Sequence, residues 1–181
     1  MTGFWTKMMR DRWVGAFAAS SKYVLRRVLS PLRPGYASFL ELGPGDGILT
    51  RALIPRLPPD GRLVAIERNP LFAEELRREI RDPRVTILSG DAVQYVHERA
   101  QSTPHEVDVV YSSIPLSFLS PEDRERVISK ASMLLQPGGV LIIFHQYSLL
   151  ALPLLRKYFR TVEWHFEPRN VFPCFVMIAH P

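Results

Sequence analysis

Short apolar runs alternate with amphipathic segments along most of the chain. The compact apolar runs predict buried strands at 38–42, 62–67, 85–88, 107–111 and 140–144. The segments between them have helical spacing and predict helices at 47–56, 70–81, 91–100, 121–135 and 149–158. Two further strands, 159–166 and 172–179, are joined by a turn at 167–170. This order predicts an α/β fold, Rossmann-like and doubly wound, whose mostly parallel seven-stranded sheet ends in an antiparallel hairpin.

The N-terminal part of the chain has a different pattern. We expect residues 1–36 to form an amphipathic helical extension and residues 37–181 to form the main domain. A helical projection gathers aromatic and apolar side chains on one broad face, namely Phe4, Trp5, Met8, Met9, Trp13, Ala16 and Phe17. Basic residues lie mostly opposite, which suits the surface of an anionic membrane. Packing of the aromatic face on the domain core is the alternative.

Composition narrows the class of protein without naming its function. A chain of 181 residues with 46% hydrophobic content fits one globular domain. The net charge of +5 suits nucleic acid or an anionic membrane, although many basic enzymes bind neither. Cys174 is the single cysteine, so we expect a buried thiol and a reducing, cytoplasmic setting. Neither a membrane span nor a signal peptide is predicted, which favours a soluble or peripheral protein.

A glycine turn follows the first predicted strand. Gly43, Gly45 and Gly47 alternate there, and Glu67 ends the next strand. A glycine turn after one strand and an acid at the tip of the next are typical of a site for ribose and adenosine. The G-x-G-x-G spacing and the nearby carboxylates of Glu41 and Asp46 disfavour a pyrophosphate, and they favour the cationic S-adenosylmethionine.

The third strand also ends in an acid. Asp91 and Ala92 follow it, and we expect them to contact the adenine, with Arg68 beside Glu67 completing the cofactor set. Taken singly, Glu67 or Asp91 reads equally well as a helix cap or a surface acid. Both acids lie at carboxyl ends of successive strands, where open α/β sheets bind ligands, and this agreement favours S-adenosylmethionine. No metal site is expected.

With these motifs, residues 37–181 resemble the class I S-adenosylmethionine-dependent methyltransferases. Residues 41–47 resemble the first motif of that family, and Glu67 and Asp91 match its acidic ribose and adenine positions. Residues 135–140 resemble the turn before its fifth strand. The resemblance implies the fold and the cofactor, and it leaves the methyl acceptor open.

The loop after the fourth strand, residues 112–116, is expected to select the acceptor. Enzymes that methylate base amino groups resemble Asn/Asp-Pro-Pro-Tyr or Asn-x-Pro-Tyr here, whereas this chain has Ser112 and Leu116 in place of the polar and aromatic residues. The loop is more similar to the Ser-Gly-Leu-Pro-Leu of bacterial phospholipid N-methyltransferases, which methylate phosphatidylethanolamine. Residues 14–21 and 170–176 also resemble segments of those enzymes, although Ser113 replaces the family glycine and Phe172 and Cys174 flank the single proline.

Several residues near these strand ends are candidates for handling the proton of an amine acceptor. Tyr111, His145 and Tyr147 could accept or relay it, and Tyr23 could cap the pocket from the N-terminal side. Ser112 is expected to shape the acceptor site as well as to contact the cofactor. A structural role is the alternative for His145.

The sequence therefore predicts an S-adenosylmethionine-dependent N-methyltransferase. The expected acceptor is phosphatidylethanolamine or a related amino-lipid, and the expected location is the cytoplasmic face of an anionic membrane. An RNA adenine N-methyltransferase is the second hypothesis, because the first half of the chain is also similar to the rRNA adenine dimethyltransferases. A non-catalytic, cofactor-binding partner subunit is the third.

Overall fold

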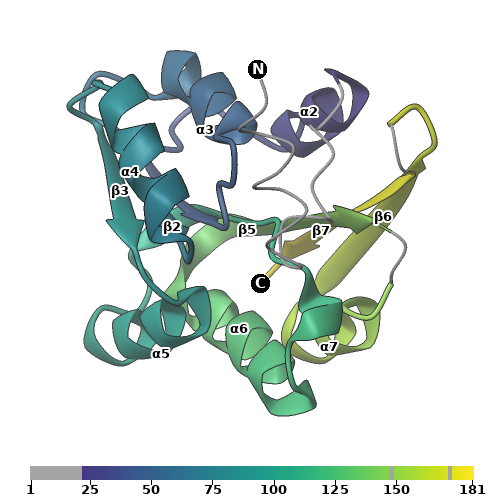
Figure 1. Cartoon of the computed structure of the whole chain (residues 1–181). Coiled ribbons are helices and arrows are strands. Elements are labelled where there is room, and N and C mark those ends of the chain that lie inside the picture. The colour runs from purple at the N-terminus through teal and green to yellow at the C-terminus, as the bar shows by residue number, and fades with distance from the viewer. Residues whose placement is uncertain (1–21, 147–148, 171–172) are drawn as a thin grey trace.

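A computed structural model describes residues 22–146, 149–170 and 173–181 and contains one seven-stranded sheet (Figure 1). The strands are β1 (Ser38–Leu42), β2 (Arg62–Glu67), β3 (Val85–Ser89), β4 (Val107–Ser112), β5 (Leu135–Gln146), β6 (Thr161–Glu167) and β7 (Cys174–His180). Their order in the sheet is β3-β2-β1-β4-β5-β7-β6. β7 runs antiparallel to β5 and to β6, and the other four strand pairs are parallel, so the predicted mostly parallel sheet with a C-terminal antiparallel hairpin is confirmed.

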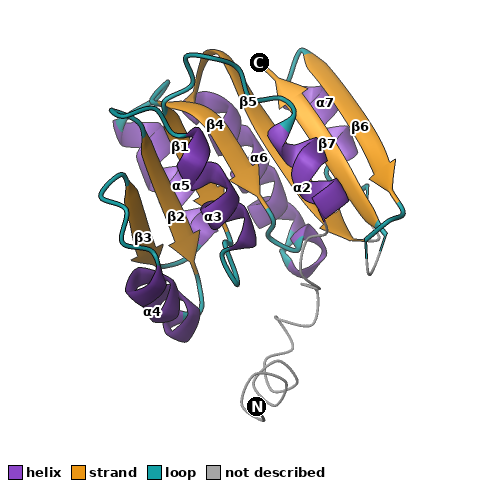
Figure 2. Ribbon diagram, turned by 90° about the horizontal axis from the view of Figure 1, so that it is seen from above, coloured by secondary structure: helices purple, strands orange, loops and turns teal. Residues whose placement is uncertain are grey.

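Helices cover both faces of the sheet. They are α2 (Lys22–Leu29), α3 (Ile48–Leu53), α4 (Pro70–Glu79), α5 (Ala92–Ser102), α6 (Pro121–Leu134) and α7 (Leu152–Tyr158), with short 3-10 turns η1 (Ile54–Arg56) and η2 (Leu116–Phe118). Figure 2 shows α2, α3 and α4 on one face and α5, α6 and α7 on the other. Side-chain caps set three helix starts: Asn69 accepts from Leu71 N, Asp91 from Val93 N, and Ser120 from Asp123 N. None of the helices in this part of the chain is long and apolar enough to cross a bilayer.

Strand alternation divides the interior into separate cores. Leu40, Val110 and Ile143 face α5, α6 and α7, whereas Val109 and its neighbours face α2 and α3. Val24 of α2 is fully buried in that second core, so residues from 22 onward pack with the sheet. The predicted amphipathic helix before residue 22 lies outside the described residues.

The predicted start of the fifth strand is wrong, because the strand begins earlier than expected. We predicted a turn at 136–139 and a strand from 140, but β5 is continuous from Leu135. Leu135 pairs with Val107, and the register then shifts so that Val140 pairs with Val109. The Pro-Gly-Gly segment therefore forms a bulge within β5, because β5 pairs with β4 both before and after this segment.

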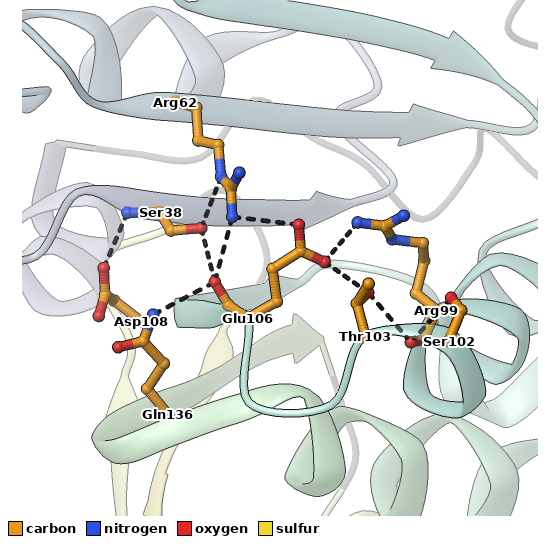
Figure 3. Close-up of polar contacts among 8 residues, drawn as sticks. All are labelled: Ser38, Arg62, Arg99, Ser102, Thr103, Glu106, Asp108 and Gln136. Atoms are coloured by element: carbon orange, nitrogen blue, oxygen red, sulfur yellow. Dashed lines mark hydrogen bonds and ion pairs between the residues drawn. The ribbon is translucent and has the colours of Figure 1, made fainter.

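A polar network ties together the amino ends of β1, β2 and β4 (Figure 3). Glu106 lies at its centre: its carboxylate accepts from Arg62 at 3.1 Å, from Thr103 at 2.6 Å and from Arg99. Asp108 accepts from the Ser38 amide at 2.8 Å. Burial alone would raise the pKa of Glu106, but the hydrogen bonds from Thr103 and Arg99 and the nearby guanidinium charges outweigh it and lower the pKa. The network stabilises the end of the sheet away from the glycine turn.

Candidate active site

The glycine turn and the acid at the end of β2 are joined directly. Gly43 N donates to Ile66 O at 2.9 Å, and Gly45 N donates to Glu67 Oε2 at 3.0 Å. The other carboxylate oxygen of Glu67 accepts from Asn69 N at 2.8 Å. Glu67 is only 8% exposed, and this burial raises its pKa although three backbone donors, those of Asn69, Gly45 and Arg68, oppose the rise. The turn and the carboxylate therefore form one preassembled unit.

Glu41 lies below this turn, in the interior. Its carboxylate accepts from Thr50 Oγ1 of α3 at 2.7 Å and is fully enclosed by the protein. Burial raises the pKa of Glu41 to about 7, and the charges of Glu67 and Asp46 add to the rise. Asp46, by contrast, is exposed and accepts from Ile48 N at 3.2 Å. Of the two acids in the turn motif, one is thus internal and one faces solvent.

The raised pKa of Glu41 predicts an unusual dependence of stability on pH. The unfolded carboxyl ionises near its ordinary value of 4.5 but the folded one only near 7, so between these values the folded state binds more protons. The free energy of unfolding should therefore fall as pH rises from about 4.5 to about 7, by on the order of 3 kcal/mol from this group. Urea titrations across this range measure it. Glu41→Gln keeps an acceptor for Thr50 and should flatten the slope; an unchanged slope would contradict the prediction.

Asp91 and Arg68 lie together at the neighbouring strand ends. Asp91 Oδ1 caps α5 by accepting from Val93 N at 2.8 Å and Gln94 N at 3.2 Å, so the helix-cap alternative describes this oxygen correctly. The second oxygen lies 3.9 Å from Arg68 Nε. Both side chains line a groove of about 650 Å³ whose walls also include Phe118. Ala92 begins α5 directly beside the cap.

The loop after β4 is fastened to the glycine turn. Ser113 N donates to Leu42 O at 3.1 Å, and Ser113 Oγ donates to Gly43 O. Sequence reasoning noted Ser113 only as a departure from a family glycine and missed this contact. Ser112 beside it is fully buried, and its Oγ has no hydrogen-bond partner in the described part of the structure. A buried hydroxyl at a strand end that is left without a hydrogen bond from the protein is a feature of ligand sites.

Tyr111 does not lie in the site, which contradicts its predicted role in proton transfer. Strand alternation turns its side chain to the α2 face, where it is fully buried and donates its hydroxyl to Val28 O at 3.0 Å. Burial raises its pKa further above the ordinary value. Tyr111 therefore holds α2 on the sheet.

The side chain of His145 lies on the face of the sheet opposite Tyr111, which is the face that Ser112 also occupies. Ser112 pairs with Ile143, and side chains two residues apart on a strand share a face. His145 is 8% exposed, and its Nε2 has no hydrogen-bond partner among the described residues. Burial lowers its pKa to about 4, so the imidazole is neutral near pH 7. Cys174 is buried nearby, as predicted, and donates its thiol to His145 O at 3.6 Å.

The remaining predicted residues are Tyr23 and Tyr147. Tyr23 of α2 lies at the β6–β7 turn, with the guanidinium carbon of Arg169 4.2 Å from its ring centre. Tyr147 lies outside the described residues. Between residues 22 and 181, leaving aside 147–148 and 171–172, no group of three or more His, Cys, Asp or Glu side chains is arranged to hold a metal ion.

These features fit S-adenosylmethionine. Gly45 has open space around it, the carboxylates of Asp46 and Glu67 lie at the turn, and that of Glu41 is buried below it. Such a charge distribution suits a sulfonium and an ammonium and repels a phosphate. A doubly wound sheet with this site at its carboxyl ends is the arrangement expected of an S-adenosylmethionine-dependent methyltransferase.

Comparison with known proteins agrees with this class. Residues 39–139 match the family model described as a methyltransferase domain, and the chain belongs to that family. It is 27% identical to an ornithine lipid N-methyltransferase of Singulisphaera acidiphila, over 74% of this chain and 70% of that protein. It is 38% identical to a probable ribosomal RNA small subunit methyltransferase A of Methanospirillum hungatei, over 45% of this chain but only 30% of that protein. The N-methyltransferase NodS from Bradyrhizobium japonicum WM9 shares the fold with a TM-score of 0.71 at 17% identity, covering 87% of this chain and 94% of that one.

Proposed function

We propose that this methyltransferase transfers a methyl group to the amine of a membrane lipid, with phosphatidylethanolamine or a related amino-lipid as acceptor. The observation that carries the proposal is the loop after β4. Where base-specific enzymes place a stacking aromatic ring, this chain has Leu116, whose side chain is fully buried in the core. The similarity to an ornithine lipid N-methyltransferase, which extends over most of both chains, supports the same choice.

The cofactor, when bound, supplies a methyl group already activated by sulfonium. On this proposal Glu67 accepts hydrogen bonds from the ribose hydroxyls, and the turn at Gly43, Gly45 and Gly47 receives the amino acid end. Asp91, Ala92 and Arg68 hold the adenine, because the groove lined by Asp91 and Arg68 also contains the aromatic ring of Phe118. The protein's own contribution is to align donor and acceptor and to exclude water.

Ser112 and His145 would receive the amine. Two buried polar atoms that have no partner among the described residues lie on the same face of neighbouring strands and offer hydrogen bonds to one small polar group. A pKa of about 4 makes His145 too weak a base to keep the proton of an ammonium group, so we assign it the orientation of an amine that has lost its proton to solvent. Tyr147 and Tyr23 remain candidates for closing the site.

Replacing His145 tests this assignment. His145→Ala should lower kcat for methyl transfer by about 10- to 100-fold while leaving cofactor affinity within about twofold, because the lost hydrogen bond is the one to the amine of the substrate. His145→Gln, which retains an acceptor atom, should recover part of the loss. His165→Ala, at a partly exposed histidine of β6, is the matched control. An equal loss in the Ala and Gln variants would point to a packing role instead.

Incubation with methyl-labelled cofactor tests the function as a whole. Liposomes of phosphatidylethanolamine mixed with phosphatidylglycerol, and separately rRNA, serve as acceptors. Label in the lipid is the expected result, and headgroups can then be varied. Label in rRNA would favour the RNA hypothesis, which the similarity to ribosomal RNA methyltransferases motivates. Cofactor binding without transfer to either acceptor would favour the partner subunit. With a lipid acceptor, the location that we propose is the cytoplasmic face of the membrane.

A further inference from the structure

The edge strand β6 exposes large apolar side chains to solvent. Its apolar positions alternate as Val162, Trp164 and Phe166, yet Trp164 and Phe166 are each 46% exposed. Phe175 of β7 completes the group, with ring centres 6.1 Å from Trp164 and 5.1 Å from Phe166. We call Trp164, Phe166 and Phe175 the aromatic ledge. Exposed apolar side chains on an edge strand are a liability that proteins usually block, so an uncovered pair suggests a binding surface.

The ledge begins where helix cover ends. The chain leaves the carboxyl end of β5, and α7 packs beside the start of β6, where Val162 contacts the core formed with Leu155 and Phe159. Trp164 and Phe166 lie further along the strand, toward the carboxyl ends of β4 and β5. The ledge thus lies on the same edge of the sheet as the glycine turn.

Basic side chains lie at the turn end of the hairpin, on the face opposite the ledge, where β6 also carries the exposed Glu163. Glu167 accepts from Arg27 at 3.0 Å and from Arg169 at 2.7 Å, and Lys22 Nζ lies 5.3 Å from the ring centre of Tyr23, over which Arg169 also lies. Two cations therefore share the Glu167 carboxylate, and a third, Lys22, lies against the Tyr23 ring. An aromatic surface beside excess positive charge is complementary to the headgroup region of an anionic bilayer, where tryptophan and basic side chains are both favoured.

The ledge is continuous with the proposed acceptor site. Phe175 pairs with His145 of β5 and Phe166 pairs with Phe175, so the three lie in one row across the sheet. Since directly paired residues share a face, this row leads from His145, whose Nε2 has no partner in the described part of the chain, to the exposed rings. A lipid amine at His145 would have its acyl chains directed along the ledge.

We propose that the aromatic ledge, with Lys22, Arg27 and Arg169 beside it, docks on an anionic phospholipid bilayer and delivers the lipid amine to the carboxyl edge of the sheet. This inference rests on the proposed function for its acceptor, but the contact with the bilayer can be measured without any methyl transfer. It involves a surface separate from the amphipathic segment predicted before residue 22.

Fluorescence of Trp164 tests the contact in the full-length protein. Trp5→Phe and Trp13→Phe leave Trp164 as the only tryptophan and leave the ledge intact. Vesicles of phosphatidylglycerol and phosphatidylethanolamine should shift its emission to the blue, and acyl chains brominated near the headgroup should quench it. In the otherwise wild-type chain, Trp164→Ser with Phe166→Ser should weaken partitioning by about tenfold. Leu71→Ser with Met133→Ser removes comparably exposed apolar groups elsewhere and should change little.

The outcomes separate the inference from the proposed function. Vesicle binding with unchanged Trp164 emission would contradict the proposed contact between the ledge and the bilayer. A dimer in the wild-type protein that the Trp164→Ser, Phe166→Ser variant loses would also contradict it, since a second copy of the chain would then cover the rings. Methylation of a short-chain, monomeric phosphatidylethanolamine in either case would leave the proposed function standing. Blue-shifted, quenched Trp164 without methylation of any lipid would support the ledge and contradict the proposed function.

Discussion

Glu67→Ala is expected to weaken binding of S-adenosylmethionine by about 100-fold and to lower kcat/KM at subsaturating cofactor in proportion. The carboxylate does two things at once: it offers acceptors at the end of β2, and it holds Gly45 N at 3.0 Å. Its removal leaves the turn amide and Asn69 N without their partner. Hydrogen bonds to charged groups contribute about 1.5–3 kcal/mol each, and about 2.7 kcal/mol corresponds to 100-fold in affinity. Calorimetric titration with the cofactor measures the effect.

Two further variants serve as controls for Glu67→Ala. Glu67→Gln retains one acceptor oxygen but presents an NH2 group to a backbone donor, so its affinity should fall between those of wild type and Glu67→Ala. Glu74→Ala removes an exposed acid from α4 and changes the net charge equally, so it should bind cofactor as wild type does. Near-normal binding by Glu67→Ala would show that the ribose acceptor lies elsewhere.

Gly47→Ala is expected to lower the free energy of unfolding by about 2–4 kcal/mol. Gly47 has φ of +74°, and a Cβ atom there would lie 2.4 Å from Leu76 Cδ2 of α4. The left-handed conformation costs a non-glycine residue about 1 kcal/mol, and overpacking a filled interior costs about 1–3 kcal/mol. Urea denaturation monitored by circular dichroism gives the change.

Gly90→Ala is the matched control, because a Cβ atom at Gly90 would meet no atom within 4 Å and its φ is not positive. It should unfold within about 0.5 kcal/mol of wild type. Combining Gly47→Ala with Leu76→Ala should cost less than the sum of the single changes, since the shortened side chain makes room for the methyl group. Strict additivity would mean that backbone strain alone causes the loss.

The positions of the acids could be predicted from the sequence because the rule behind them is global. Parallel strands end at one edge of a sheet, so Glu67 and Asp91 had to lie at that edge once the strands were recognised. The family, the cofactor and the sheet with its hairpin follow from the same pattern, and they are confirmed. Asp91 also shows the limit of the rule, since its Oδ1 caps α5 as any surface acid would.

The choice between the two faces of a strand could not be predicted. Tyr111 and Ser112 are adjacent on β4, and alternation requires only that they face opposite ways. Which of them meets a helix depends on α2, whose Val28 carbonyl binds the Tyr111 hydroxyl from 83 positions earlier in the chain. Sequence spacing contains no information about such a contact, so Tyr111 was placed wrongly.

Local turn chemistry was also misleading where tertiary pairing competed with it. The Pro-Gly-Gly segment after Leu135 has the composition of a turn, yet β4 offers hydrogen bonds on both sides of it, and the strand continues through a bulge. Thr50 and Ser113 are further examples: each is an ordinary residue whose partner, the Glu41 carboxylate or the Gly43 carbonyl, becomes evident only in the folded chain.

The polar network around Glu106 has a consequence for how this domain diversifies. It closes the amino ends of the strands, whereas the glycine turn lies at the other end of β1, five residues or roughly 16 Å away. Substitutions at such a separation combine additively. A substitution in the network should therefore leave the effect of a substitution at the glycine turn unchanged, so the two ends can be altered independently.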